Sequence, residues 1–376
     1  MAAEKEILVG GQAVMEGVMM KLPESWALTV RRSNGDFVTK TGLCKPWSDR
    51  WPILKLPVLR GGAVLISTLI LGMKCLFFSS DIVAADIEAE EQAKKDEDAG
   101  NKGGGKPTGG ATTSLLTLAN LLLLTFVTSL PDGTESDDEG TASNDASGAG
   151  AATAVEGDKP VEGGMRWYEI ALSGGVALLL FLGLFKALPL AVAWGAKSVW
   201  PALGHPVAES LISGVALLCV FISYLWLVSR LPDIRRVFQY HGAEHKVVYL
   251  HENGGEREVA AAQEYSTFHP RCGTSFLVFM VATSILVWAA FPMDVGFLGK
   301  FLLRLALFPL IIGLSYEMIR LTARKRTQSL FKALLTPGLW TQRITTKPPD
   351  DSMVAVSLNS LALAEEVANG TRAPSD

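Results

Sequence analysis

The chain has 376 residues, of which 49% are hydrophobic and 19% are charged, and its formal net charge is −4. This balance is more apolar than that of a typical soluble domain and favours a membrane protein. No basic tract or aromatic-rich patch indicates a nucleic-acid partner. The four cysteines form no CxxC pair, which argues against both a disulfide framework and a zinc ribbon.

Residues 1–58 are expected to form a small soluble unit rich in β-structure. Residues 26–32 and 37–41 are runs of β-type residues that predict two strands. Asn34-Gly35 between them predicts a tight type I′ hairpin turn, because both residues tolerate positive φ. The N-terminal unit should therefore contain at least one β-hairpin.

A glycine-rich segment at residues 10–20 precedes the hairpin. Its glycines indicate tight turns or the close approach of another backbone. We interpret the segment as a packing loop. The alternative is that Gln12 or Glu16 within it belongs to a functional site.

Residues 59–85 are predicted to form an apolar helix that spans a bilayer, lies in its interface or is buried in the protein. Residues 86–165 are of low complexity, and we expect them to be disordered because they cannot bury enough apolar surface. Within them, the charge-free stretch 111–130 is long enough to span a membrane or to lie along its surface.

Residues 166–325 are predicted to form a bundle of membrane helices. Its four spans are expected at roughly 168–194, 208–229, 274–293 and 298–319. Lys186 and Arg304 within them are expected to snorkel to the interface, with contact to a substrate or lipid headgroup as the alternative. The fold class is thus an α-helical integral membrane protein with about four to six spans, a small N-terminal β-rich unit and a cytoplasmic helical loop.

Orientation follows from the basic residues. The loop 230–273 carries six arginine and lysine residues, whereas the loops 195–207 and 294–299 on the other side carry almost none. The positive-inside rule therefore places the loop 230–273 and the C-terminal tail, residues 326–376, in the cytoplasm. The lipid bilayer is the expected partner, together with an unknown substrate or protein.

A dense group of possible metal ligands lies in the loop. His241, Glu244 and His245 fall within a predicted helix over residues 234–252, and the helical period places all three on one face. Gly242 among them costs roughly 1 kcal/mol relative to alanine in a helix. A backbone or a ligand that passes close to the helix would explain this glycine.

The spacing His-x-x-Glu-His is the one found in inverzincin metalloproteases. Two imidazoles four residues apart can bind one divalent metal ion, for which zinc is the expected identity. Glu244 can act as a general base on a water molecule. A third ligand is needed, for which His269 is the first choice, while Cys272 is a candidate fourth ligand. Cys272, Glu252 and Glu317 are the other candidates for the third position.

These residues leave three classes of function open. The leading hypothesis is a metal-dependent enzyme, most simply a hydrolase, with Glu244 as its catalytic base. The second is a non-catalytic assembly factor or scaffold, in which four protein ligands close a structural metal site and leave no position for water. The third is a transporter, for which Lys186, Arg304 and Glu317 lining a common cavity would be evidence.

Six short sequence blocks, spread over most of the chain, together form a distinctive pattern. They are GGQAVMEGVMM, the RGG at 60–62, YHGAEHK, HPRCGTSFL, GLSYEMIRL and PGLWTQRITT-x-PPDD. Together they resemble the YqhQ-like family of bacterial membrane proteins, a domain of unknown function commonly labelled a predicted metal-dependent enzyme. The resemblance implies a multi-pass protein of the bacterial inner membrane and a bound metal, and it supplies no substrate. The family pattern is matched at His241, Glu244, His245, His269 and Cys272. The long insert 86–165 differs from the family's usual shorter linker.

Overall fold

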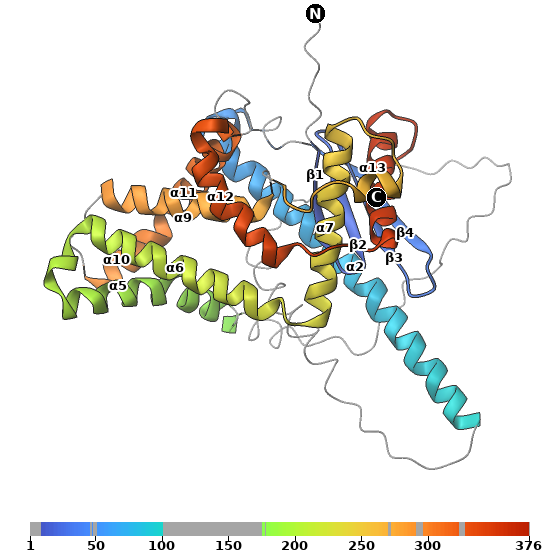
Figure 1. Ribbon diagram of the computed structural model, residues 1–376, viewed down its shortest axis with the longest axis horizontal. Coiled ribbons are helices and arrows are strands. Elements are labelled where there is room, and N and C mark those ends of the chain that lie inside the picture. Colours follow the sequence, from blue (N-terminus) through green and yellow to red (C-terminus); the bar gives the residue numbers. More distant parts are fainter. Residues whose placement is uncertain are drawn as a thin grey trace, which may run out of the picture. The chain divides into compact units, whose positions relative to one another are not determined.

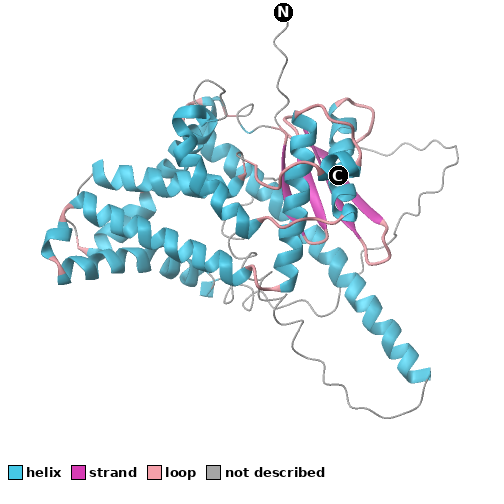
Figure 2. Cartoon of the chain, in the orientation of Figure 1, coloured by secondary structure: helices cyan, strands magenta, loops and turns pink. Residues whose placement is uncertain are grey.

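The computed structural model describes residues 9–45, 47, 51–100, 175–176, 178–269, 272–290, 296–322 and 328–375. Most of them are helical, and one four-stranded sheet lies near the N-terminus (Figures 1 and 2). The chain divides into two units, and every contact and pocket described below lies within the unit made of residues 1–105 and 183–376. The predicted apolar stretch 111–130 lies outside the described residues.

The sheet is an antiparallel meander in which each strand pairs with the next along the chain. Its strands are β1 (Gly10–Val14), β2 (Gly17–Lys21), β3 (Ser25–Arg31) and β4 (Phe37–Leu43). The first two strands correct the interpretation of residues 10–20 as a packing loop. Two of their three glycines lie where neighbours come close. A Cβ atom on Gly11 would lie 2.5 Å from the Glu244 side chain, and one on Gly17 would lie 2.5 Å from the carbonyl oxygen of Thr29 on β3. The glycine content therefore reflects tight packing of a strand rather than a loop.

The hairpin between β3 and β4 is confirmed, but its turn differs from the predicted type I′ turn. Arg32 donates its backbone N–H to the carbonyl of Asp36 at 2.9 Å, so three residues form the loop. Of Asn34 and Gly35, only Gly35 has positive φ, at 91°. The Asn34 side chain accepts a hydrogen bond from the Asp36 backbone N–H at 3.0 Å, which keeps Asn34 in a right-handed turn. This is the common three-residue connection that ends in a left-handed glycine.

Three helices from distant parts of the chain complete a mixed α/β module around one face of the sheet. They are α7 (Pro232–Glu252), α8 (Val259–Gln263) and α13 (Asp351–Ala368). Apolar side chains of β2, α7, α8 and α13 form a single buried cluster. We call the sheet with these helices the α/β module.

Helix α13 lies in the predicted C-terminal tail, residues 326–376, and packs against the sheet. Ser25 of β3 donates its hydroxyl to the carbonyl of Ala364 at 2.6 Å, and Ser360 donates to the carbonyl of Val18 at 2.7 Å. The small Ala and Ser residues on this face of α13 allow the helix to lie close against the sheet. The C-terminal segment is therefore part of the module's core.

The other face of the sheet is covered by α2 (Leu59–Gly100), which follows the short helix η1 (Pro52–Lys55). Buried Cys75 of α2 packs with Met19 and Leu28 of the sheet. The helix continues well past residue 85, where we placed its end, because residues 86–97 are rich in Ala, Glu, Gln and Lys, which favour helix.

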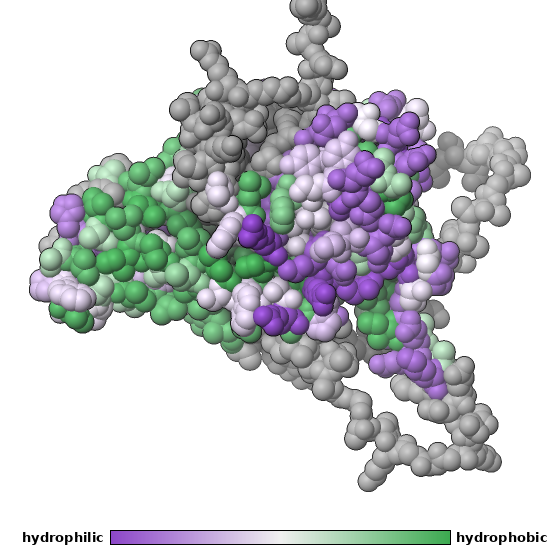
Figure 3. All heavy atoms as spheres, viewed as in Figure 1, coloured by the Kyte–Doolittle hydropathy of each residue, from purple (hydrophilic) through white to green (hydrophobic). Residues whose placement is uncertain are grey.

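The remaining helices are mostly apolar. They are η2 (Gly183–Ala187, a π-helical turn), α5 (Leu188–Val199), η3 (Pro201–Gly204), α6 (Pro206–Val228), α9 (Gly273–Ala290), α10 (Phe297–Ala306), α11 (Phe308–Thr322) and α12 (Gln328–Thr345). Apolar residues cover the visible surface of α5, α6 and α10, whereas hydrophilic residues dominate that of the α/β module (Figure 3). This division is consistent with a membrane protein.

Among the described residues, three helical segments are long and apolar enough to cross a bilayer: Leu59–Lys94, Leu178–Val199 and Val207–Val228. The pair α10 and α11 makes a fourth if it counts as one span, but it is bent by 50°. The predicted span over 298–319 thus corresponds to two helices that meet at this bend. Pro309 explains it, because proline cannot donate the backbone hydrogen bond that would join the two helices.

Candidate metal centre

The predicted metal-ligand helix exists as α7, which begins four residues after α6 ends and enters the α/β module. Gly242 lies where the chain after α12 crosses this helix: a Cβ atom there would be 2.2 Å from the carbonyl oxygen of Lys347. Lys347 also donates its backbone N–H to the carbonyl of Phe238 at 2.9 Å. A backbone passing close to the helix, one of the two explanations offered for Gly242, is thus what the structure shows.

His241 and His245 lie one turn apart on α7, with their ring centroids 4.5 Å apart. The Nδ1 of His241 lies 2.9 Å from the carbonyl oxygen of Thr345, and the Nδ1 of His245 lies 2.5 Å from that of Thr267. A carbonyl oxygen can only accept, so each Nδ1 carries the proton. Both Nε2 atoms are therefore left as lone-pair donors, which is how metal-binding histidines are commonly oriented.

Cys272 joins the two histidines from the residue before α9. Its Sγ lies 3.3 Å from the Nε2 of His241. One ligand atom from each of His241, His245 and Cys272 falls within 4.8 Å of the other two. Tetrahedral zinc with bonds of about 2.0–2.3 Å holds its ligand atoms roughly 3.3–3.8 Å apart, so small side-chain movements would bring this set onto one ion.

Glu244 is buried, at 6% exposure, beside this cluster. A Cβ atom on Gly11 of β1 would lie 2.5 Å from the Glu244 side chain, and the Gly11 backbone N–H donates a hydrogen bond to its carboxylate. Burial raises the pKa of Glu244, against the opposing effects of nearby histidines and Gly11. Its Oε2 lies 3.5 Å from the Nε2 of His245, so two electron-rich atoms face each other. A cation there would compensate both, and these residues therefore fit a metal ion.

His269 lies next to the cluster but faces elsewhere. Its Nε2 lies 3.4 Å from Glu252, and its ring packs 4.5 Å from Tyr249 and 5.7 Å from His245, measured between centroids. Burial lowers the pKa of His269. Of the candidates for the third ligand, the structure thus brings Cys272 into the cluster, while His269 and Glu252 contact each other.

Glu317, the remaining candidate, lies elsewhere. Both of its carboxylate oxygens accept hydrogen bonds from Arg60 of α2, at 2.6 and 2.5 Å. The Arg60 guanidinium therefore holds this side chain as an ion pair between α2 and α11.

Sequence reasoning missed several residues that position this site. Gln342 of α12 is fully buried, accepts from the backbone N–H of His269 at 2.8 Å and donates to its carbonyl at 2.7 Å. Thr345 and Thr267 act through their backbone carbonyls, which no side-chain pattern reveals. The sequence offered little signal for Gln342, because its neighbours Thr341 and Arg343 are polar as well.

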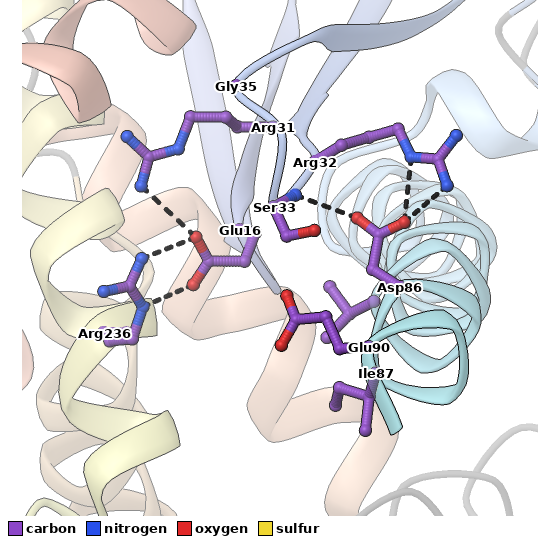
Figure 4. A pocket seen from close by; sticks show the side chains of 10 residues that line it. Glu16, Arg31, Arg32, Ser33, Gly35, Asp86, Ile87, Glu90 and Arg236 are labelled. Carbon is purple, nitrogen blue, oxygen red and sulfur yellow. Dashed lines mark hydrogen bonds and ion pairs between the residues drawn. The ribbon is translucent and has the colours of Figure 1, made fainter. Parts of the chain in front are cut away.

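Glu16 lies at the turn between β1 and β2, with φ of 49°, away from the candidate ligands. Its carboxylate accepts hydrogen bonds from the Arg236 guanidinium, and Arg31 lies 3.6 Å away (Figure 4). It also accepts a hydrogen bond from the Tyr240 hydroxyl at 3.1 Å. Burial on its own would raise the pKa of Glu16, but Arg236, with Tyr240 and Arg31, brings it below its ordinary value. Glu16 thus connects the β1–β2 turn to α7, where its partner Tyr240 directly precedes His241.

This ion pair lines a pocket of about 480 Å³ between the hairpin turns, α2 and α7 (Figure 4). On its opposite side Arg32 pairs with Asp86 of α2. The guanidiniums that line the pocket are thus matched by carboxylates.

Gln12, the other residue singled out in the glycine-rich segment 10–20, lies against Gly72 of α2 and serves packing.

The fold and the site define a class: a helical protein with candidate bilayer spans and an α/β module that carries a cluster of His, Cys and Glu side chains. The chain belongs to a family described as a protein of unknown function (DUF1385), whose model matches residues 56–367. It is 28% identical over 371 residues to the uncharacterized protein YqhQ of Bacillus subtilis (strain 168), an alignment that covers 97% of this chain and 96% of that protein. No solved structure matches the chain.

Proposed function

We propose that this protein is a metal-dependent membrane enzyme, most simply a hydrolase. His241, His245 and Cys272 would hold a divalent ion, expected to be zinc, and Glu244 would act as the general base. The observation that carries the proposal is the convergence of one ring nitrogen from each of the two histidines and the Sγ of Cys272 within 4.8 Å, with each histidine already oriented by a backbone carbonyl. Orientation by a backbone carbonyl in this way is typical of metal-binding histidines.

Each residue of the cluster has a definite task in this proposal. When bound, the metal would act as a Lewis acid and lower the pKa of a water molecule. The carbonyls of Thr345 and Thr267 keep the imidazoles in one tautomer. Burial raises the pKa of Glu244, which makes its carboxylate a stronger base toward a water molecule.

The position of the cluster favours a substrate that resides in or near the membrane. Cys272 directly precedes the apolar helix α9, and α7 follows the candidate span α6. The site would thus lie at the membrane surface, and the basic residues of loop 230–273 support a cytoplasmic location in the bacterial inner membrane. A peptide bond or a lipid-linked ester at that level would be within reach.

The second candidate function is a non-catalytic scaffold with a structural metal. The short distance of 3.5 Å between Oε2 of Glu244 and Nε2 of His245 favours it, because Glu244 could then serve as the fourth ligand. Four protein ligands would close the site to water. The two candidates therefore differ in what Glu244 does.

The first test is the metal content of the detergent-purified protein by plasma mass spectrometry. The wild type should carry about one metal ion per chain, and the double variant His241→Ala/His245→Ala should carry none. His205→Ala is the matched control, because His205 lies at the start of α6, away from the cluster, and should leave the metal in place. A metal-free wild type after loading with zinc would refute the proposal.

Glu244→Gln separates the two candidates. If Glu244 is the base, this variant keeps its metal and loses hydrolysis of a panel of membrane-anchored peptides and esters by 10²-fold or more. Loss of the metal itself would instead assign Glu244 as a ligand and favour the scaffold. Full activity in this variant would exclude Glu244 as the base.

A further inference from the structure

A second polar cluster lies among the apolar helices, independent of the proposed enzyme. A small, partly open cavity of about 40 Å³ is lined by residues of η2, α5, α6, α9, α10 and α11. Two of its lining residues are cationic, Lys186 of η2 and Arg304 of α10, and three are serines. Basic residues within apolar helices are expensive, and they commonly mark a functional site.

The cavity has an excess of positive charge. None of the described residues that line it is acidic. Glu209, one residue from the lining Ser210, is close enough to interact electrostatically with Arg304, but both of its oxygens already accept hydrogen bonds from Lys300 at 2.7 Å. The three cations in and beside the cavity are thus accompanied by a single carboxylate, that of Glu209.

Aromatic rings contact the two cations. The Nζ of Lys186 lies 3.8 Å from the ring centroid of Phe308, and the Cζ of Arg304 lies 5.5 Å from that of Trp288. Such contacts are weaker than an ion pair in apolar surroundings, so positive charge remains to be neutralised. Arg304 also donates to the hydroxyl of Ser213 at 2.6 Å, which leaves the proton of that hydroxyl available for an anion.

Both cations lie at irregularities of their helices. Lys186 belongs to the π-helical turn Gly183–Ala187, and Arg304 precedes the 50° break between α10 and α11. Single π-turns and broken membrane helices occur frequently at binding sites, because they redirect side chains and backbone groups toward a ligand. Two such irregularities around one cavity are difficult to explain by packing alone.

The depth of the cavity indicates its ligand. Ser210 and Ser213 lie roughly 6–11 Å from the start of α6, near the end opposite the metal centre. Headgroups and their phosphates extend over a comparable depth at each face of a bilayer. A cavity of 40 Å³ also suits a single small anionic group rather than a whole metabolite.

From these observations we infer that Lys186, Arg304 and Ser213 form a binding site for a phosphate group, carried by a phospholipid or free in solution. The cations would neutralise the phosphate oxygens, and the serine would donate a hydrogen bond. Simple snorkelling would instead carry both cations out to the interface, as in Lys197 at the exposed end of α5, whereas Lys186 and Arg304 remain half-buried.

Native mass spectrometry of the delipidated, full-length protein tests this site. The probes are phosphatidylglycerol, inorganic phosphate and, as a lipid without phosphate, diacylglycerol. The wild type should bind one phosphatidylglycerol at least tenfold more tightly than Lys186→Gln/Arg304→Gln, and diacylglycerol should not distinguish them. Ser213→Ala keeps both charges and should weaken binding about threefold, and Lys197→Gln is the matched control that should bind as the wild type does.

The outcomes are distinct. Variant-sensitive binding of phosphatidylglycerol identifies a lipid site, and variant-sensitive binding of inorganic phosphate alone identifies a site for the free anion. If the wild type binds neither probe, the inference is refuted even if the double variant does not fold. If Lys197→Gln weakened binding as much as the double variant does, the inference would also be refuted, because binding would then depend on overall charge.

Discussion

The candidate metal centre and the cationic cavity are two polar clusters of opposite character. At the first, His241, His245, Cys272 and Glu244 gather lone pairs and a carboxylate, so the cluster is suited to a cation. At the second, Lys186 and Arg304 gather positive charge next to aromatic rings, so the cluster is suited to an anion. The comparison teaches that the backbone fixes the first cluster, through carbonyls and a glycine, whereas helix irregularities produce the second.

The largest expected effect concerns the third position of the metal centre. Cys272→Ala should lower metal affinity by at least 10³-fold, because it removes a ligand, whereas His269→Ala should lower it only about tenfold, the effect of a residue outside the ligand set. Competition with a chromogenic chelator measures both affinities. A larger loss in His269→Ala would restore His269 as the third ligand and change the description of this cluster.

The next effect tests whether the backbone fixes this centre. Gly242→Ala places a methyl group against the carbonyl of Lys347 and should destabilise the α/β module by about 1–3 kcal/mol. Thermal unfolding in detergent measures the change. Gly62→Ala in α2, where a Cβ atom meets nothing within 4 Å, is the matched control and should be neutral or slightly stabilising. Equal unfolding temperatures of Gly242→Ala and the wild type would contradict the close crossing.

A smaller effect on stability is expected at Glu16, which links the β1–β2 turn to α7. Because its folded pKa lies below the ordinary value of 4.5, its contribution to stability is present above pH 4.5 and is lost as the pH falls through the folded pKa. Glu16→Gln should therefore lower stability by about 1 kcal/mol at pH 7 and flatten the decline below pH 4.5. Denaturant titrations at several pH values measure both, with the exposed Glu90→Gln as control. An unchanged acid profile would remove Glu16 from this role.

In the last test we expect no change in metal content. The test asks whether the candidate metal centre and the cationic cavity are independent of each other. Lys186→Gln/Arg304→Gln should keep the metal content of the wild type, because roughly 22 Å of α6 separates Ser213 from the end of that helix. Plasma mass spectrometry of the folded double variant gives the answer. Loss of metal in that variant would show that the two clusters are coupled and would end the comparison.

Local features of the fold were accessible from the sequence. The β3–β4 hairpin, helix α7 and the close approach at Gly242 follow from residue type and spacing over short distances. By contrast, β1 and β2 were interpreted as a loop because of their glycines. Gly11 makes room for Glu244 and Gly17 makes room for Thr29, and the sequence alone does not reveal these neighbours. The place of α13 in the core depends on the same kind of distant contact.

The candidate site divides in the same way. The helical period alone places His241, Glu244 and His245 together. The choice between Cys272 and His269 depends on how the chain returns after α8, and the carbonyls of Thr345 and Thr267 have no side-chain signature. Lys186 and Arg304 stood out in the sequence as charges within apolar segments. Their common cavity, however, depends on the helix break near Pro309 and on a π-turn at residues 183–187 that no residue pattern predicted.

X-ray absorption spectroscopy of the purified protein at the edge of its bound metal tests the central claim most directly. We expect about one metal ion per chain, with two imidazole nitrogens at about 2.0–2.1 Å and one sulfur at about 2.3 Å. Loss of the sulfur signal in Cys272→Ala would complete the assignment. A stoichiometric metal without sulfur in the wild type, or no bound metal after loading with zinc, would contradict the account.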